Sequence, residues 1–264
     1  MHDTVKSSAP SAPAAPSAPS APTAPAARAA RGLREARVAV LHGSPATASL
    51  VRSLVEQGIG HVRLIGGGAD ADIAGRGEVN GVEWRADLVP WPDTAEAMHG
   101  CLEGADLAVA TVGGPILFYD WLARLNEVCH ARSLPWLRVS VPSADEIHLG
   151  PLVAPGATAC HACFELRYKS NIGRLEDYLP FEADQRGQRH GVDFGVPPPM
   201  FELCGALGAR EAARFLADDG APETLGRLVV VDPHRPSISR HAVLPLPRCE
   251  VCSPPRAAAP ELAL

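Results

Sequence analysis

Apolar positions beyond residue 36 form two kinds of pattern, short unbroken runs and helical stripes. The runs are bounded by glycine or proline, which is typical of buried strands, and they lie at 37–41, 61–65, 105–112 and 135–140. Between the first two runs, apolar residues from Leu50 to Val55 recur at the helical period and predict a helix over 46–57. This order of strand, helix and strand predicts an α/β fold with a mostly parallel sheet.

The same rules predict the remaining elements. Further helices are expected where apolar stripes recur, at 94–102, 117–132, 165–175 and 200–217. Shorter strands are expected at 82–85, 226–231 and 239–244, and the last two should form an antiparallel part because only a short connection separates them. Two stretches without a usable pattern, 70–80 and 177–199, are expected to be loops, and the second is long enough to dock a partner.

The first 35 residues have a different composition. From Pro10 to Pro25 a proline recurs at every third position, with alanine, serine and threonine between, which is typical of an extended polyproline II segment. No side chain there is large enough to bury against a core. We expect a disordered tail over 1–35, either without function or acting as a spacer, a folded domain over 36–255, and a disordered end over 256–264.

Composition and charge exclude several classes of function. Hydrophobic residues make up 46% and the formal net charge is -6, so nothing indicates a nucleic-acid partner. No apolar run approaches the ~20 residues needed to span a bilayer, and no secretion signal is evident at the N-terminus. Seven cysteines, four of them in metal-binding spacing, fit a reducing compartment better than a disulfide framework. A cytoplasmic protein without membrane attachment is therefore expected.

Two C-x-x-C pairs are the strongest chemical signal in the chain. Cys160 with Cys163, and Cys249 with Cys252, have the spacing that lets two thiolates of one turn reach a shared tetrahedral cation. The four residues together predict one structural Zn²⁺ site that ties the chain end to its middle. The alternative is two unrelated pairs, redox-active or simply reduced. His161, inside the first pair, is expected to face solvent.

The three remaining cysteines, Cys101, Cys129 and Cys204, are expected to be small buried core residues rather than nucleophiles. No catalytic residue is assigned. His42 is the one histidine of interest, and a polar turn residue is its simpler interpretation.

Over residues 36–255 the chain resembles the ThiF family of ubiquitin-activating-like adenylyltransferases. The resemblance rests on the opening strand, turn and helix, on Val109-Ala110-Thr111 and on the two cysteine pairs. Residues 150–160 and 240–249 are similar to the branch found in thiazole/oxazole-modified microcin (TOMM) biosynthesis. In that branch the ThiF-like protein helps present a precursor peptide to a YcaO-type cyclodehydratase, which is the protein that spends ATP.

The nucleotide-binding positions that the resemblance implies have lost their usual residues. Glycines let backbone approach phosphate, carboxylates hold the ribose and Mg²⁺, and a lysine holds the phosphates. No lysine lies between Lys6 and Lys169, and Asp70 or Asp72 would have to replace the lost carboxylates. Gly43 is retained at the turn. The resemblance implies glycines at three positions that are here His42, Ser44 and Thr47. It also implies a ribose-binding carboxylate where this chain has Gly66 and a metal-binding aspartate where it has Val112.

The sequence therefore supports three hypotheses. The first is a non-catalytic scaffold, a pseudoenzyme subunit in the biosynthesis of a bacteriocin-like modified peptide, with zinc as cofactor and ATP not expected. The second is an ATP-dependent adenylyltransferase that activates a carboxylate, and the third is a zinc-stabilised binding module of unrelated role. Most relatives carry a winged-helix module that binds the leader peptide, and residues 1–35 cannot form one. The precursor peptide is thus bound directly or through a separate recognition protein, and a homodimer is compatible with either arrangement.

Overall fold

The computed structural model describes residues 32–66, 75–79, 82–113, 119–186, 195–218 and 221–253. Residues 1–31 of the tail expected over 1–35, the tail expected over 256–264, and the candidates Asp70 and Asp72 lie outside these residues, whereas residues 33–35 form a 3-10 turn. The described part forms one nine-stranded sheet in the order β3-β4-β2-β1-β5-β6-β7-β8-β9. Its strands are β1 (Arg37–Leu41), β2 (His61–Ile65), β3 (Gly75–Val79), β4 (Val82–Val89), β5 (Leu107–Gly113), β6 (Trp136–Val141), β7 (Ile147–Val153), β8 (Arg227–Asp232) and β9 (Ser237–Ala242).

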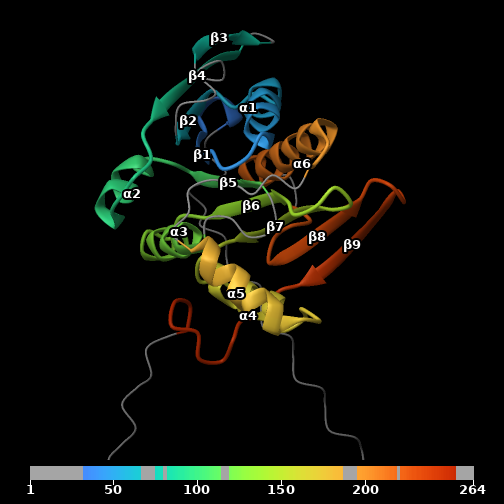
Figure 1. Ribbon diagram of the computed structural model, residues 1–264. Coiled ribbons are helices and arrows are strands. Elements are labelled where there is room, and N and C mark those ends of the chain that lie inside the picture. Colours follow the sequence, from blue (N-terminus) through green and yellow to red (C-terminus); the bar gives the residue numbers. More distant parts are fainter. Residues whose placement is uncertain are drawn as a thin grey trace, which may run out of the picture.

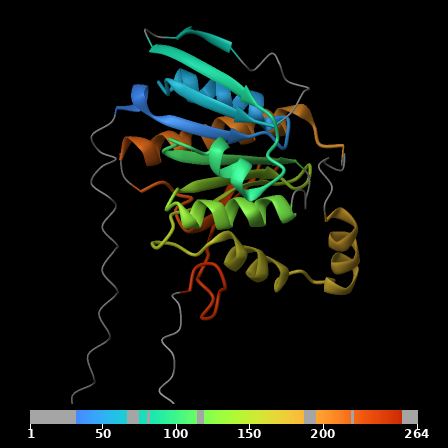
Figure 2. The same cartoon turned by 90° about the vertical axis from the view of Figure 1, so that its left-hand side faces the viewer.

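Helices cover both faces of the sheet, as Figure 1 and the turned view in Figure 2 show. Helices α1 and α6 pack with one hydrophobic cluster on one face, and α2, α3 and α4 contribute to a second cluster on the other. The helices are α1 (Ala46–Glu56), α2 (Ala95–Cys101), α3 (Tyr119–Ala131), α4 (His161–Lys169), α5 (Leu175–Gln185) and α6 (Pro198–Ala217), with a 3-10 turn η1 (Leu33–Glu35) before β1.

The centre of the sheet is parallel and its margins are antiparallel. Strands β4, β2, β1, β5 and β6 run parallel to one another, whereas β3 pairs antiparallel with β4, and β7, β8 and β9 continue the sheet antiparallel from β6. The predicted α/β, Rossmann-like class with an antiparallel C-terminal part is therefore confirmed. Because β1 lies between β2 and β5, the sheet has its switch point at the carboxyl ends of β1 and β5, where such folds bind ligands.

Two differences from the expected strands have physical causes. Strand β3 lies inside the predicted loop 70–80, since its glycine-rich sequence pairs with β4 while the Trp84 indole covers Gly77. Strand β7 was not predicted because Gly150-Pro151 interrupts its apolar run, yet all of its residues are buried. A Cβ on Gly150 would lie 2.4 Å from the carbonyl oxygen of Arg227, so the close approach of β8 requires glycine there.

The predicted loop over 177–199 is wrong in its first half, which is helical. Helix α5 covers Leu175–Gln185, and its Glu182 side chain is 5% exposed. The Glu182 carboxylate accepts hydrogen bonds from Lys169 Nζ at 2.7 Å and Arg186 Nη2 at 2.5 Å. Arg186 also bonds Asp120 of α3, so charged groups fasten α5 to α4 and α3. A partly buried ion-pair network of this kind leaves no apolar stripe in the sequence.

Candidate functional site

The four cysteines of the two pairs lie together, as their spacing predicted. Cys160 is the N-cap of α4 and Cys163 is in its first turn, while Cys249 and Cys252 lie in the turn that follows β9. The sulfur–sulfur distances are 3.9 Å between Cys160 and Cys163, 3.5 Å between Cys160 and Cys249, and 3.4 Å between Cys163 and Cys252. All four sulfurs lie within 4.8 Å of one another.

This cysteine cluster has the size and chemistry of a tetrahedral metal site. Thiolates about 2.3 Å from one zinc ion would be about 3.8 Å apart, close to the distances observed. Burial raises the pKa of the Cys160 thiol to about 11, so a cation is needed to hold it as thiolate. The backbone N–H of Leu246 donates to Cys163 Sγ at 3.3 Å, as outer partners of metal-bound thiolates do. The residues present therefore fit a structural metal.

His161 does not face solvent as expected; it is 4% exposed and packs between Trp136 and Phe164. Its backbone N–H donates to Asn126 Oδ1 at 3.0 Å, which ties the start of α4 to α3. Burial, aided by the charge of Arg138, lowers the pKa of His161 to about 3, so the ring is neutral. A neutral imidazole packed against aromatic rings has a structural role in orienting the first cysteine pair.

The turn after β1 is closed by its own hydrogen bonds. Thr47 Oγ1 lies 2.8 Å from His42 Nδ1 and 2.7 Å from Thr111 Oγ1. The N–H of Gly43 donates to Thr111 Oγ1 at 3.0 Å, and the N–H groups of Ala46 and Thr47 donate to the side chain and carbonyl of Ser44. Backbone donors at a helix start bind anions only when they are free. At this turn they are occupied by hydroxyl and carbonyl groups of the chain itself.

Apolar groups surround the two positions at which the resemblance implies carboxylates. Gly66 has φ +124, and a Cβ there would lie 2.7 Å from Cε2 of Trp91. Trp91 packs edge-on against Trp121, with ring centroids 4.5 Å apart. The side chain of Val112 is 1% exposed and belongs to the hydrophobic cluster that also contains Met98 and Leu125. Neither position can present an oxygen ligand to a nucleotide or metal.

Trp91 is the residue of this crevice that sequence reasoning missed. It lies between Pro90 and Pro92, and this Pro-Trp-Pro sequence directly after β4 was the available signal for a fixed aromatic side chain. Of the other cysteines, Cys129 and Cys204 are buried and Cys101 is partly buried. Burial raises the pKa of each of the three thiols, to about 12 for Cys204, so none resembles an activated nucleophile.

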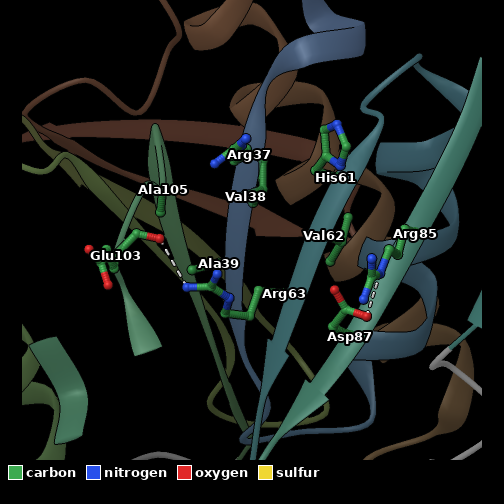
Figure 3. Close-up of a pocket in the computed structure, with 10 residues that line it drawn as sticks. All are labelled: Arg37, Val38, Ala39, His61, Val62, Arg63, Arg85, Asp87, Glu103 and Ala105. Atoms are coloured by element: carbon green, nitrogen blue, oxygen red, sulfur yellow. Dashed lines mark hydrogen bonds and ion pairs between the residues drawn. The ribbon is translucent and has the colours of Figure 1, made fainter. Parts of the chain in front are cut away.

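A cavity of about 280 Å³ lies elsewhere, on the sheet face over β1, β2 and β4 (Figure 3). Arg85 pairs with Asp87 at 2.6 Å, and Arg63 donates to the carbonyl oxygens of Cys101 and Glu103 at 2.8 and 3.0 Å. Both arginines therefore have partners, and the cavity lies beside the amino-terminal halves of β1 and β2, whereas the crevice lies at the carboxyl ends of β1 and β5.

No protein-family model matches the chain, and no curated protein matches it by sequence. Solved structures do match. The Escherichia coli protein MccB in complex with AMPCPP and MccA has a TM-score of 0.62 and 18% identity, over 84% of this chain and 67% of that one. MccB described as the microcin C7 biosynthetic enzyme, with N-formylated MccA, also has a TM-score of 0.62 at 18% identity, over 84% of this chain and 68% of that one.

A heterocyclase in complex with substrate and cofactor has a TM-score of 0.55 and 17% identity. The match covers 85% of this chain but only 26% of the heterocyclase, so this chain spans about a quarter of that protein. In the described part of the chain no helix is long and apolar enough to cross a membrane. At these identities the matches establish the fold: the chain has the Rossmann-like architecture of MccB and of one part of a heterocyclase, consistent with the ThiF-type fold that its sequence resembles.

Proposed function

We propose that this protein is a non-catalytic partner of a YcaO-type cyclodehydratase in the biosynthesis of azol(in)e-modified peptides, where it helps present the precursor peptide. The observation that carries the proposal is the closed crevice at the switch point. The donors of Gly43, Ala46 and Thr47 are bonded within the chain, and Trp91 fills the space beside Gly66. These contacts favour a scaffold over a nucleotide-binding role.

The energetics favour loss of adenylation. One preorganised donor or charge commonly contributes about 3–4 kcal/mol to transition-state stabilisation. Here the turn after β1 and both positions at which the resemblance implies carboxylates depart from the family. The rate of adenylation should therefore fall below detection, even if the individual losses of stabilisation do not add up fully. The closing contacts at Ser44, Thr47 and Val112 are buried, which means that they are part of the core and do not open at low cost.

We further propose that the cysteine cluster holds one structural zinc ion, and that residues 36–255 form the functional unit. The metal would bind Cys160, Cys163, Cys249 and Cys252 and join the end of β9 to the start of α4. Zinc in such a site supplies folding free energy rather than chemistry. It would keep the β7–β9 margin of the sheet in place as a surface for partners.

The competing function is an ATP-dependent adenylyltransferase of the ThiF class. It is favoured by the likeness in fold to MccB, which has been solved with ATP. An ATP–pyrophosphate exchange assay with the purified chain separates the two functions, because only an adenylyltransferase returns label to ATP. Exchange above background, or micromolar affinity for ATP by calorimetry, would overturn the scaffold role.

The direct test is reconstitution with the YcaO-type enzyme of the same organism. We expect the two proteins to co-purify, and heterocyclisation of the precursor peptide to be at least tenfold faster when this chain is present. An enzyme that works equally fast without it would contradict the proposal. Failure to associate at all would instead favour a zinc-stabilised module of unrelated role.

A further inference from the structure

Strand β9 is one margin of the sheet, and its outer backbone edge has no strand beside it among the described residues. The N–H of Val243 donates to the carbonyl oxygen of Gly226, and the register pairs His241 with Leu228 and Ser239 with Val230. Hydrogen-bonded pairs alternate along an antiparallel ladder. The N–H and C=O groups of Ile238, Arg240 and Ala242 therefore point away from β8, in position to bond an added strand.

A cavity of about 490 Å³ lies beside this edge, between α4 and the strands β7, β8 and β9. It is lined by Ser239 and His241 of β9, by Leu228 and Val230 of β8, and by Phe164 and Tyr168 of α4. Polar side chains of Glu146, His148, Arg167 and Asn171 also line it. Arg167 of α4 donates to the carbonyl oxygens of Leu244 and Pro245, which holds the chain after β9 against this helix. The cavity thus has an apolar part, formed by β8 and α4, beside a polar part that includes Glu146 and His148.

Side chains of an added strand would reach this cavity. In a sheet, side chains directly opposite on neighbouring strands lie about 4.5–5.5 Å apart, and diagonal ones about 7–8 Å apart. A large apolar side chain placed opposite Ser239 could therefore pass over this small residue toward Val230 and Phe164. The phenol of Tyr168 makes no hydrogen bond to the described residues and can donate to such a ligand.

The charge of the hairpin indicates which peptides would bind. Residues 227–243 carry three exposed arginines against one aspartate, in a chain whose net charge is -6. Arg240 pairs with Glu223 at 2.8 Å, so Arg227 and Arg235 carry the excess positive charge of this hairpin. The aspartate, Asp232, already accepts hydrogen bonds from the N–H groups of His234 and Arg235. The free edge is thus locally cationic and complements acidic side chains.

We infer that β9 is a docking edge for an extended acidic segment of the precursor peptide, which adds a strand to β9 and inserts one apolar or aromatic side chain into the cavity below Ser239. This inference rests on the proposed function and gives a route by which this chain would bind the precursor peptide directly. Backbone hydrogen bonds would supply affinity, and the cavity together with the arginines would supply selectivity.

The first test uses the full chain and a short fluorescein-labelled peptide that alternates glutamate and valine around a central phenylalanine. Fluorescence anisotropy should show saturable binding that weakens with salt, and at least tenfold weaker binding of the same peptide with lysine at every glutamate. Arg240→Pro removes an outward N–H without breaking a bond to β8 and should weaken binding at least tenfold relative to Arg240→Ala. Equal binding by these two variants, or no preference for the acidic peptide, would overturn the inference.

The second test addresses the cavity. Ser239→Trp fills it and should weaken binding at least tenfold, whereas Ser237→Trp places the same side chain on the same face of β9 outside the cavity and should not. If Arg240→Pro changes the sedimentation of the protein from dimer to monomer and leaves peptide binding intact, a second copy occupies the edge and the inference is wrong. Reconstitution with the cyclodehydratase separates the two proposals. If Arg240→Pro and Ser239→Trp both stimulate the enzyme as strongly as the wild type does, the docking edge is refuted and the proposed function is not.

Discussion

The indole of Trp91 occupies the space in which a side chain on Gly66 would have to begin, since a Cβ there would lie 2.7 Å from Cε2 of the indole. This relationship joins the end of β2 to the segment after β4 at the mouth of the crevice. It excludes a ribose-binding carboxylate at position 66 by geometry as well as by residue type.

Gly66→Ala should therefore destabilise the protein by about 2–4 kcal/mol, from a strained positive φ and from overpacking against Trp91. Gly58→Ala is the matched control, because Gly58 also has a positive φ but no heavy atom within 4 Å of an added Cβ. The Gly58→Ala variant should lose only the free energy that comes from the strained positive φ. Urea unfolding measures the loss of stability in each variant. If the two variants lose the same free energy, the contact with Trp91 is not restrictive.

The cysteine cluster makes a separate prediction. Purified protein should contain one zinc per chain, and Cys163→Ser should abolish the metal and lower the free energy of unfolding by more than about 3 kcal/mol. Cys129→Ser, at a buried cysteine outside the cluster, should keep the metal and lose about 1–2 kcal/mol. Elemental analysis and thermal unfolding with and without a chelator test this. Zinc well below one per chain in the wild type would refute the site.

The cysteine cluster and the central sheet could be predicted because each leaves a local signal. Buried strands such as β1 and β5 are unbroken apolar runs, and the paired spacing of Cys160 with Cys163 fixes a turn geometry. In contrast, β3 and α5 depend on contacts that leave no apolar period in the sequence. Gly77 packs under Trp84, and Glu182 is held by Lys169 and Arg186, so neither element has a periodic apolar stripe of its own.

The residues of the crevice could be predicted from the sequence only in part. The resemblance located the changed positions His42, Ser44, Thr47, Gly66 and Val112, but sequence alone could not show what replaced the ligand. In the structure the hydroxyl of Thr111 accepts from the N–H of Gly43, and Trp91 occupies the space beside Gly66. Such replacements depend on distances across the sheet, which single-sequence patterns do not encode.

His148 should make stability sensitive to mild acid. Burial, together with the charges of Arg138 and His241, lowers the pKa of His148 below 6.5, although its 2.8 Å hydrogen bond to Glu146 opposes this. The folded state thus keeps the ring neutral while the unfolded chain binds a proton. The stabilisation is present above pH 6.5 and is lost as the pH falls from 6.5 through the lowered pKa of the folded state.

His148→Gln should accordingly lose less stability than the wild type on acidification from about pH 7 to about pH 5, as measured by urea unfolding at several pH values. His234→Gln, on the exposed hairpin, controls for the loss of one histidine and should keep the wild-type pH dependence. Identical slopes for wild type and His148→Gln would show that this ring does not contribute.

The packing of α1 against α6 depends on the absence of a single methyl group. A Cβ on Gly205 of α6 would lie 2.5 Å from the carbonyl oxygen of Ala46 and 2.6 Å from the backbone nitrogen of Leu50. Backbone atoms cannot move aside cheaply, so Gly205→Ala should separate the helices and cost about 1–3 kcal/mol despite the better helix propensity of alanine. Gly100→Ala in α2 meets no atom within 4 Å and should stabilise by about 0.5–1 kcal/mol. Thermal unfolding of the two variants tests this, because replacing glycine by alanine should lower the stability at position 205 and raise it at position 100.

Because α1 begins at the turn after β1, the Gly205→Ala variant should also weaken the hydrogen bonds of Thr47. Faster amide exchange at Gly43 and Thr47 would reveal this weakening.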